Sequence, residues 1–133
     1  MHKLVSLIPA VLLLVAGSAQ AATSRGPDAE LARAIEGRIA GKPVNCINLR
    51  DIRSSRIIDR TAIVYEVSGG TNYVNRPTSG AFSLRSGLIL VTDTHSSQLC
   101  SIDIVRLYDS LSRMELGSIG LGKFVPYRKP SRP

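Results

Sequence analysis

The sequence predicts an α+β fold, in which an N-terminal helix packs on a small, mostly antiparallel β-sheet of five to seven strands that carries one disulfide bond. Two patterns support this class. Apolar residues recur at every fourth position near the start of the mature chain, which is typical of an amphipathic helix. From Val44 onward, short runs rich in β-branched residues alternate with turn residues, which is typical of antiparallel strands. A helix followed by a run of strands favours an α+β arrangement.

The helix is expected over residues 28–40. Leu31, Ile35 and Ile39 form its apolar stripe. Pro27 suits the first turn of a helix because its missing N–H would have no partner there. The glycine and the proline that follow residue 40 are typical of a helix end.

A hairpin is the clearest β feature of the sequence. Residues 61–67 and 71–76 form its expected strands, and glycines 69–70 form an expected two-residue turn, because glycine tolerates the positive φ angles of such turns. With this loop length, Tyr65 faces Val74 across the hairpin. The face expected to point into the core carries Ile63, Tyr65, Val67 and Val74.

Other segments complete the predicted sheet. Further strands are expected at residues 44–49, 56–58 and 88–94, with one or two more within 114–125. Residues 99–108 allow either strand or helix, and their β-branched residues favour strand. The prolines and basic residues of 126–133 predict an extended, poorly ordered basic tail. The single domain is therefore expected to span residues 27–125.

The first 21 residues have the layout of a secretory signal peptide. A run of about 13 residues, mostly apolar, precedes Ala19-Gln20-Ala21, which fits the small-residue cleavage pattern. As a helix this run spans roughly 20 Å, which is short of the roughly 30 Å of a bilayer core, although an uncleaved anchor remains an alternative. Residues 22–26 would form a flexible lead. Cleavage would leave a basic chain with 16 Lys and Arg against 10 acidic residues and no later membrane span, and we expect it to be periplasmic or secreted.

Cys46 and Cys100 are the two cysteines of the whole chain. In an exported protein an even cysteine count favours a disulfide. A reactive dithiol is the alternative, but redox pairs usually have a Cys-x-x-Cys spacing, whereas these two cysteines are far apart. The sequence therefore predicts one structural disulfide.

The residue types needed for catalysis and metal binding are sparse. His95 is the one histidine of the mature chain, so the number of available ligands is too small for a typical tetrahedral zinc site. Asp93 and His95 could serve a periplasmic hydrolase, but a polar strand end that leads into a serine-rich turn explains them as well. The glycine-rich segment 117–122 is not followed by a helix, so it indicates close backbone approach rather than a phosphate loop. No cofactor is expected.

Arginine is the main source of the positive charge, and four arginines lie close together in the sequence. Arg50, Arg53, Arg56 and Arg60 are candidate anion-binding residues, because guanidinium groups bind phosphate and carboxylate well. The same arginines would also be expected on an ordinary solvated face, or on the docking face of a subunit or an inhibitor. Aromatic residues are not interleaved with them, which disfavours nucleic-acid binding. We therefore expect a non-enzymatic exported or envelope-associated protein that binds an anionic envelope component or another protein. The sequence does not indicate an oligomeric state.

From Cys46 onward, the chain resembles a group of small exported bacterial proteins of unknown function. Over about 80 residues, the matching stretches are Asn45-Cys46-Ile47, residues 52–59, Tyr73-Val74-Asn75-Arg76, residues 99–103 and residues 121–127. Members of that group often have an additional cysteine pair, near the positions of Ser79–Phe82 and just before the final Leu-Gly-x-Phe. This chain has no cysteine at those places, so only the bond between Cys46 and Cys100 is expected. The resemblance implies no activity.

Overall fold

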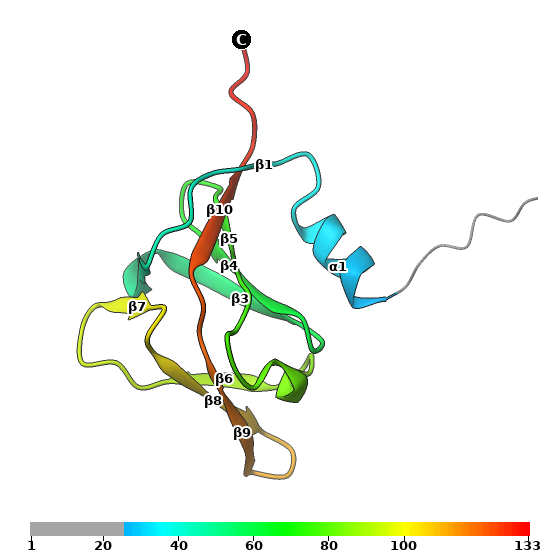
Figure 1. Cartoon of the computed structure of the whole chain (residues 1–133), viewed down its shortest axis with the longest axis vertical. Helices are drawn as coiled ribbons and strands as arrows, with labels where there is room; N and C mark the ends of the chain where they lie inside the picture. The colour runs from blue at the N-terminus through cyan, green and yellow to red at the C-terminus, as the bar shows by residue number, and fades with distance from the viewer. Residues whose placement is uncertain (1–25) are drawn as a thin grey trace, which may run out of the picture.

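The computed structural model describes residues 26–133, so the expected signal peptide at 1–21 and all but the last residue of the lead at 22–26 lie outside the described residues. Within residues 26–133 the chain forms ten short β-strands and three short helices (Figure 1). The helices are the α-helix α1 (Pro27–Ala34) and the 3₁₀ helices η1 (Leu49–Asp51) and η2 (Ala81–Ser83). The strands are β1 (Ile39–Ala40), β2 (Cys46–Asn48), β3 (Ile52–Ile58), β4 (Ala62–Val67), β5 (Asn72–Asn75), β6 (Ile89–Thr92), β7 (Gln98–Cys100), β8 (Ile104–Asp109), β9 (Met114–Gly120) and β10 (Phe124–Arg128).

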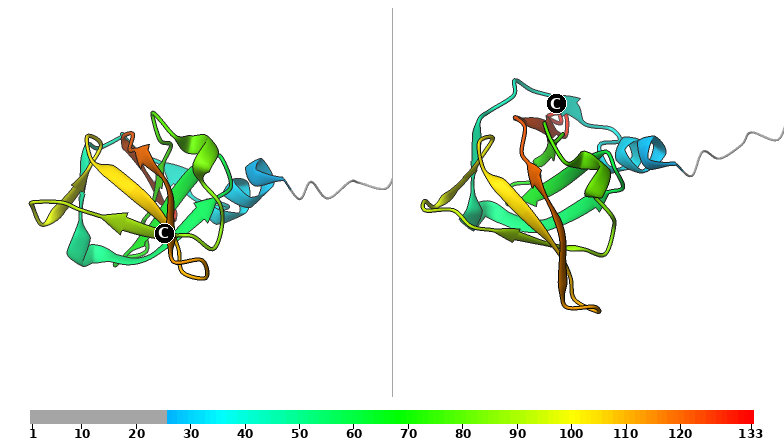
Figure 2. Two further views of the ribbon diagram at one scale, coloured as in Figure 1. Left: turned by 90° about the horizontal axis from the view of Figure 1, so that it is seen from below. Right: turned by 60° about the horizontal axis from the view of Figure 1, so that its bottom comes forward.

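The strands form three sheets. The largest has the order β1-β10-β5-β4-β3, the second joins β6, β8 and β9, and the smallest pairs β2 with β7. Every paired strand in this region is antiparallel to its neighbour. The views in Figure 2 show the sheets wrapping around a common interior, with the β8–β9 hairpin projecting from the body.

The main hydrophobic core is built from all three sheets. Its fully buried members include Ile63 of β4, Leu99 of β7, Leu107 of β8 and Phe124 of β10. Tyr65 packs edge-on against Phe124, with the ring centroids 5.9 Å apart. Aromatic pairs favour this edge-to-face geometry because of their charge distribution. Residues that are distant in sequence therefore pack together in one core.

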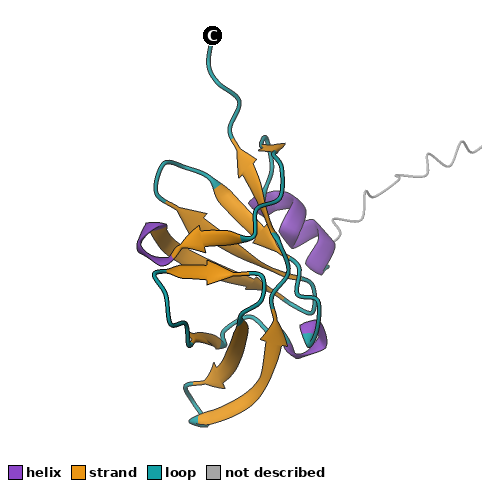
Figure 3. Cartoon of the chain, turned by 60° about the vertical axis from the view of Figure 1, so that its left-hand side comes forward, coloured by secondary structure: helices purple, strands orange, loops and turns teal. Residues whose placement is uncertain are grey.

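A second, smaller cluster lies on the opposite face of the five-stranded sheet. Leu31 of α1 contributes to it, together with Ile58, Ala62, Val64 and Val74 of the sheet. Figure 3 shows α1 beside this sheet. Because β4 has a core cluster on each face, its residues 62–65 are all buried, and the strand lacks the alternation of a half-exposed strand.

The predicted α+β class is wrong. Residues 26–133 are mostly β, with 45% of them in strands and 13% in helices, and the strands form three sheets instead of the single sheet under one helix that the sequence predicted. The helix ends at Ala34 and not at residue 40, because the chain turns through Gly37 at a φ of +67°. Ile39, assigned by the sequence to the apolar stripe, instead begins β1 and pairs with Arg128.

The β4–β5 hairpin confirms the expected strands but shifts their register by one residue. Tyr65 lies opposite Tyr73, not Val74, and Val67 donates its N–H to the Thr71 carbonyl at 3.0 Å. The loop therefore has three residues, Ser68 to Gly70. A one-residue slip moves side chains to the other face of a sheet. For this reason Val74 packs with Val64 near α1, away from Tyr65.

Two other segments also depart from the expectation or resolve an open alternative. Residues 99–108 contain the end of β7 and most of β8, so the strand alternative is confirmed. The expected basic tail at 126–133 begins later, because residues 126–128 belong to β10, where the Pro126 carbonyl accepts a hydrogen bond from the Gly41 N–H at 2.7 Å. A proline lacks only the donor, so its carbonyl still pairs in a sheet.

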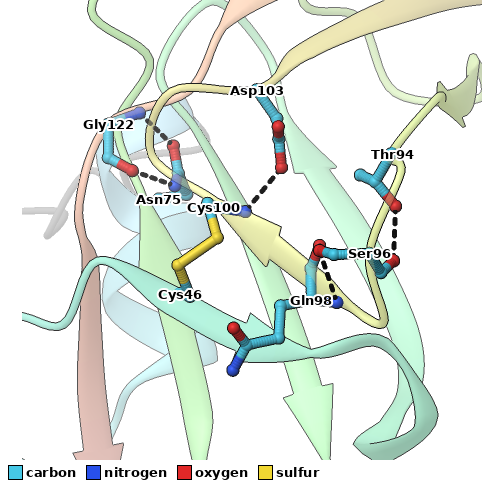
Figure 4. Close-up of a disulfide and its surroundings, with 8 residues drawn as sticks. All are labelled: Cys46, Asn75, Thr94, Ser96, Gln98, Cys100, Asp103 and Gly122. Atoms are coloured by element: carbon cyan, nitrogen blue, oxygen red, sulfur yellow. Dashed lines mark hydrogen bonds between the residues drawn. A yellow bond between two sulfur atoms is a disulfide. The ribbon is translucent and has the colours of Figure 1, made fainter.

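The glycine-rich segment 117–122 allows the close backbone approach that the sequence indicated. A side chain at Gly122 would collide with the Arg76 carbonyl oxygen, and one at Gly120 would collide with the Ser79 hydroxyl. Beside this contact, fully buried Asn75 donates to the Gly122 carbonyl at 2.7 Å and accepts from the Gly122 N–H at 3.0 Å. The Asn75 side chain thus substitutes for a strand partner where β9 leads into β10 (Figure 4).

Candidate functional site

The disulfide between Cys46 and Cys100 is confirmed (Figure 4). The two cysteines are direct partners in the β2–β7 pairing, and the next residues along, Ile47 and Leu99, are both buried in the main core. The bond therefore holds together a sheet of only three residue pairs and keeps its apolar face on the core. This position is structural.

The four arginines that lie within 11 residues of the sequence do not form one patch. Arg50 lies on η1, Arg53 sits at a bulge in β3, Arg56 is in the middle of β3, and Arg60 occupies the β3–β4 turn. All four are exposed. Since β3 has seven residues at about 3.3 Å each, Arg50 and Arg60 lie at opposite ends of a strand roughly 20 Å long.

Two of these arginines have acidic neighbours. Arg56 forms an exposed ion pair with Glu66 on β4 at 3.4 Å, with half of the arginine side chain in solvent. Arg60, with a φ of +54°, follows Asp59, whose carboxylate accepts a hydrogen bond from the Ser86 N–H at 2.6 Å. That bond and the Ser86 hydroxyl lower the pKa of Asp59, and the charges of Arg60 and Arg85 lower it further.

The fold brings the backbone of Arg60 next to the residue that precedes Arg85, although 25 positions separate the two arginines in the sequence. The link is the backbone of the loop before β6: the Arg60 N–H donates to the Leu84 carbonyl at 3.0 Å, and Leu84 is fully buried. The sequence pointed to no role for Arg85. A leucine followed by an arginine in a loop could have suggested a basic residue held in place by a buried neighbour. Nothing in the sequence indicated that Arg60 would lie beside that loop.

An apolar pocket of about 230 Å³ lies next to Arg85. It is lined by Phe82, Ser83, Arg85, Leu88 and Leu116. Phe82 is 76% exposed, which is unusual for a phenylalanine, and Leu116 on β9 is also exposed. The short helix η2 that carries Phe82 packs against β9, where Ser83 lies beside Gly117, and this packing places Phe82 at the pocket. This site combines a positive charge with apolar surface.

Asp93 and His95 lie in the exposed loop between β6 and β7. Among the hydrogen bonds of residues 26–133, none joins the side chains of Asp93 and His95. The loop is held by a bond from the Thr94 hydroxyl to the Ser96 carbonyl at 3.0 Å and by bonds between Ser96 and Gln98. An exposed histidine without an oriented carboxylate lacks the geometry of a triad. Nothing in this loop supports the hydrolase alternative.

In the part of the chain that the structure describes, no three His, Cys, Asp or Glu residues are grouped closely enough to hold a metal ion. No helix among these residues is both long and apolar enough to span a membrane. Comparison of the chain with protein families, curated proteins and solved structures finds no match. The resemblance to small exported bacterial proteins therefore stays a prediction.

Proposed function

We propose that this chain is an exported, non-enzymatic, envelope-associated protein that binds anionic molecules carrying an apolar part, such as a phosphorylated glycolipid. The observation that carries the proposal is the exposed Phe82 beside Arg85 at an apolar pocket, with Arg60 bonded through its backbone N–H to the carbonyl of Leu84, the residue before Arg85. Phosphate and acyl groups occur together in such ligands, and this surface offers a group for each.

Export is part of the proposal. It is supported by the signal-peptide layout of residues 1–21 and is compatible with the disulfide and with the absence of a spanning helix from residues 26–133. The positive charge of the mature chain favours encounter with an anionic surface. At about 0.15 M salt the screening length is roughly 8 Å, so only arginines close to the ligand would contribute.

Vesicle binding tests the proposal. The mature chain is mixed with vesicles of phosphatidylglycerol or of phosphatidylcholine, and bound protein is measured over a salt series. We expect binding to phosphatidylglycerol that weakens as salt rises. Each arginine near an anionic surface contributes about 1 kcal/mol, so Arg60→Gln and Arg85→Gln should each weaken binding by roughly fivefold.

Arg53→Gln is the matched control, because Arg53 is also exposed but lies on β3 and does not line the pocket. Phe82→Ser tests the apolar part and should weaken binding without changing the salt dependence. Equal binding to both vesicle types would contradict the proposal. A loss upon Arg53→Gln as large as the loss upon Arg85→Gln would assign the effect to net charge instead of this surface.

A further inference from the structure

A second pocket, of about 250 Å³, lies between the β2–β7 sheet and the β4–β5 hairpin, and its character is polar. Six polar side chains line it: Asn48, Asp51, Ser68, Thr71, Tyr73 and Gln98. They come from three segments that are distant in sequence, namely the continuous β2–η1 segment, the β4–β5 hairpin and β7. No motif in the sequence pointed to this site.

The walls of the pocket are tied together. Asn48 and Gln98 are direct partners in the β2–β7 pairing, so their side chains lie side by side, two positions from the disulfide. Figure 4 shows Gln98 on the strand that carries Cys100. On the other wall, the Ser68 N–H donates to the Asp51 carbonyl at 2.9 Å, which ties the hairpin loop to η1. The polar groups are therefore preorganised by backbone contacts and a covalent bond.

The chemistry of the lining selects an uncharged ligand. Asp51 is the one charged residue among those that line the pocket, and none of them is basic, which disfavours an anion. Its carboxylate already accepts a hydrogen bond from the Asn48 amide at 3.4 Å. The amides and hydroxyls each offer both donors and acceptors, as do the hydroxyl groups of a sugar. The half-buried ring of Tyr73 adds an apolar surface for the C–H face of a ring.

We propose that this pocket binds one ring of a neutral saccharide. The volume lies below the roughly 300–1,000 Å³ of pockets that enclose drug-sized ligands, so it suits a single sugar ring with its neighbours in solvent. Asn48 and Gln98 bind hydroxyl groups from one side, Ser68 and Thr71 bind them from the other, and Tyr73 stacks beneath. The proposal does not depend on anion binding at Phe82 and Arg85.

The test is an NMR titration of the ¹⁵N-labelled mature chain with maltose and with N,N′-diacetylchitobiose. We expect a dissociation constant of about 1 mM, so the concentration of each sugar is raised to about ten times that value. We expect saturable shifts of the backbone amides of Asn48, Ser68 and Gln98 with at least one of these sugars. Sodium phosphate and triglycine are the comparison ligands. A lack of saturable shifts with both sugars overturns the proposal, as does tighter binding of triglycine at the same amides, which would identify a peptide site.

Variants connect the shifts to the pocket. Asn48→Ala and Gln98→Ala each remove side-chain hydrogen bonds and should weaken sugar binding about fivefold. Asn45→Ala is the matched control, since Asn45 is exposed nearby but does not line the pocket, and it should leave the affinity unchanged. Thermal unfolding verifies that each variant is folded. Unchanged affinity in both pocket variants, or an equal loss in the control, overturns the assignment.

Discussion

Replacing Asn75 by alanine should be among the most destabilising polar-to-apolar changes in this protein. The side chain is fully buried and makes two hydrogen bonds to Gly122, one to the carbonyl at 2.7 Å and one from the N–H at 3.0 Å. Truncation leaves both Gly122 groups buried without a partner, and each such group costs about 1–3 kcal/mol. With the small cavity that remains, the free energy of unfolding should fall by about 3–5 kcal/mol.

The assay is urea unfolding followed by circular dichroism, with the free energy taken from linear extrapolation. Asn72→Ala is the matched control, because Asn72 is also on β5 and buried but makes one hydrogen bond, to the Ala34 carbonyl at 3.0 Å. Its loss should cost about 1 kcal/mol. If Asn75→Ala is no more destabilising than this control, the bonds to Gly122 do not hold the β9–β10 connection in place.

Asn75→Asp separates donor from acceptor at the same position. The carboxylate still accepts from the Gly122 N–H but faces the Gly122 carbonyl without a proton to donate. Burial favours the neutral acid, so its pKa in the folded state rises above the unfolded value of about 3.9. The deficit relative to wild type is therefore smallest below about pH 4 and grows as the pH rises through the folded pKa. A deficit that does not change with pH would refute this reasoning.

Three other predictions concern the disulfide, acid stability and export. Cys100→Ala should lower the free energy of unfolding by about 2–4 kcal/mol because the bond closes a long loop; urea curves that coincide with and without reductant would mean that it contributes nothing. Asp59 has a pKa lowered by its bond from Ser86, so it stabilises the fold above pH 3.8 and that contribution is lost as the pH falls through the folded pKa. Asp59→Asn should therefore flatten the acid side of the melting-temperature profile between about pH 2 and 5. Intact mass of protein from its native compartment should correspond to a chain that starts at Ala22, and a mass that retains residues 1–21 would contradict export.

Local chemistry along the chain was enough to predict several features. The disulfide was predicted from an even cysteine count behind a segment with a signal-peptide pattern, and the structure pairs the two cysteines directly across β2 and β7. The hairpin strands followed from β-branched runs around two glycines, because such residues limit the backbone to few conformations. The close approach at residues 117–122 followed from glycine, which is required where a Cβ would strike another backbone.

Pairing between distant segments decided the rest. Ile39 fits a helical stripe, but its pairing with Arg128 in β10 makes it a strand residue, and no local pattern contains that partner. The sequence placed Val74 on the wrong face because one extra residue in the loop shifts the β4–β5 pairing by one position. Likewise, the Arg60 N–H bonds to the Leu84 carbonyl next to Arg85, whereas Arg50 lies at the other end of the seven-residue strand β3. Spacing along a chain limits distances only over a few residues, and beyond that range the packing of the sheets determines which side chains meet.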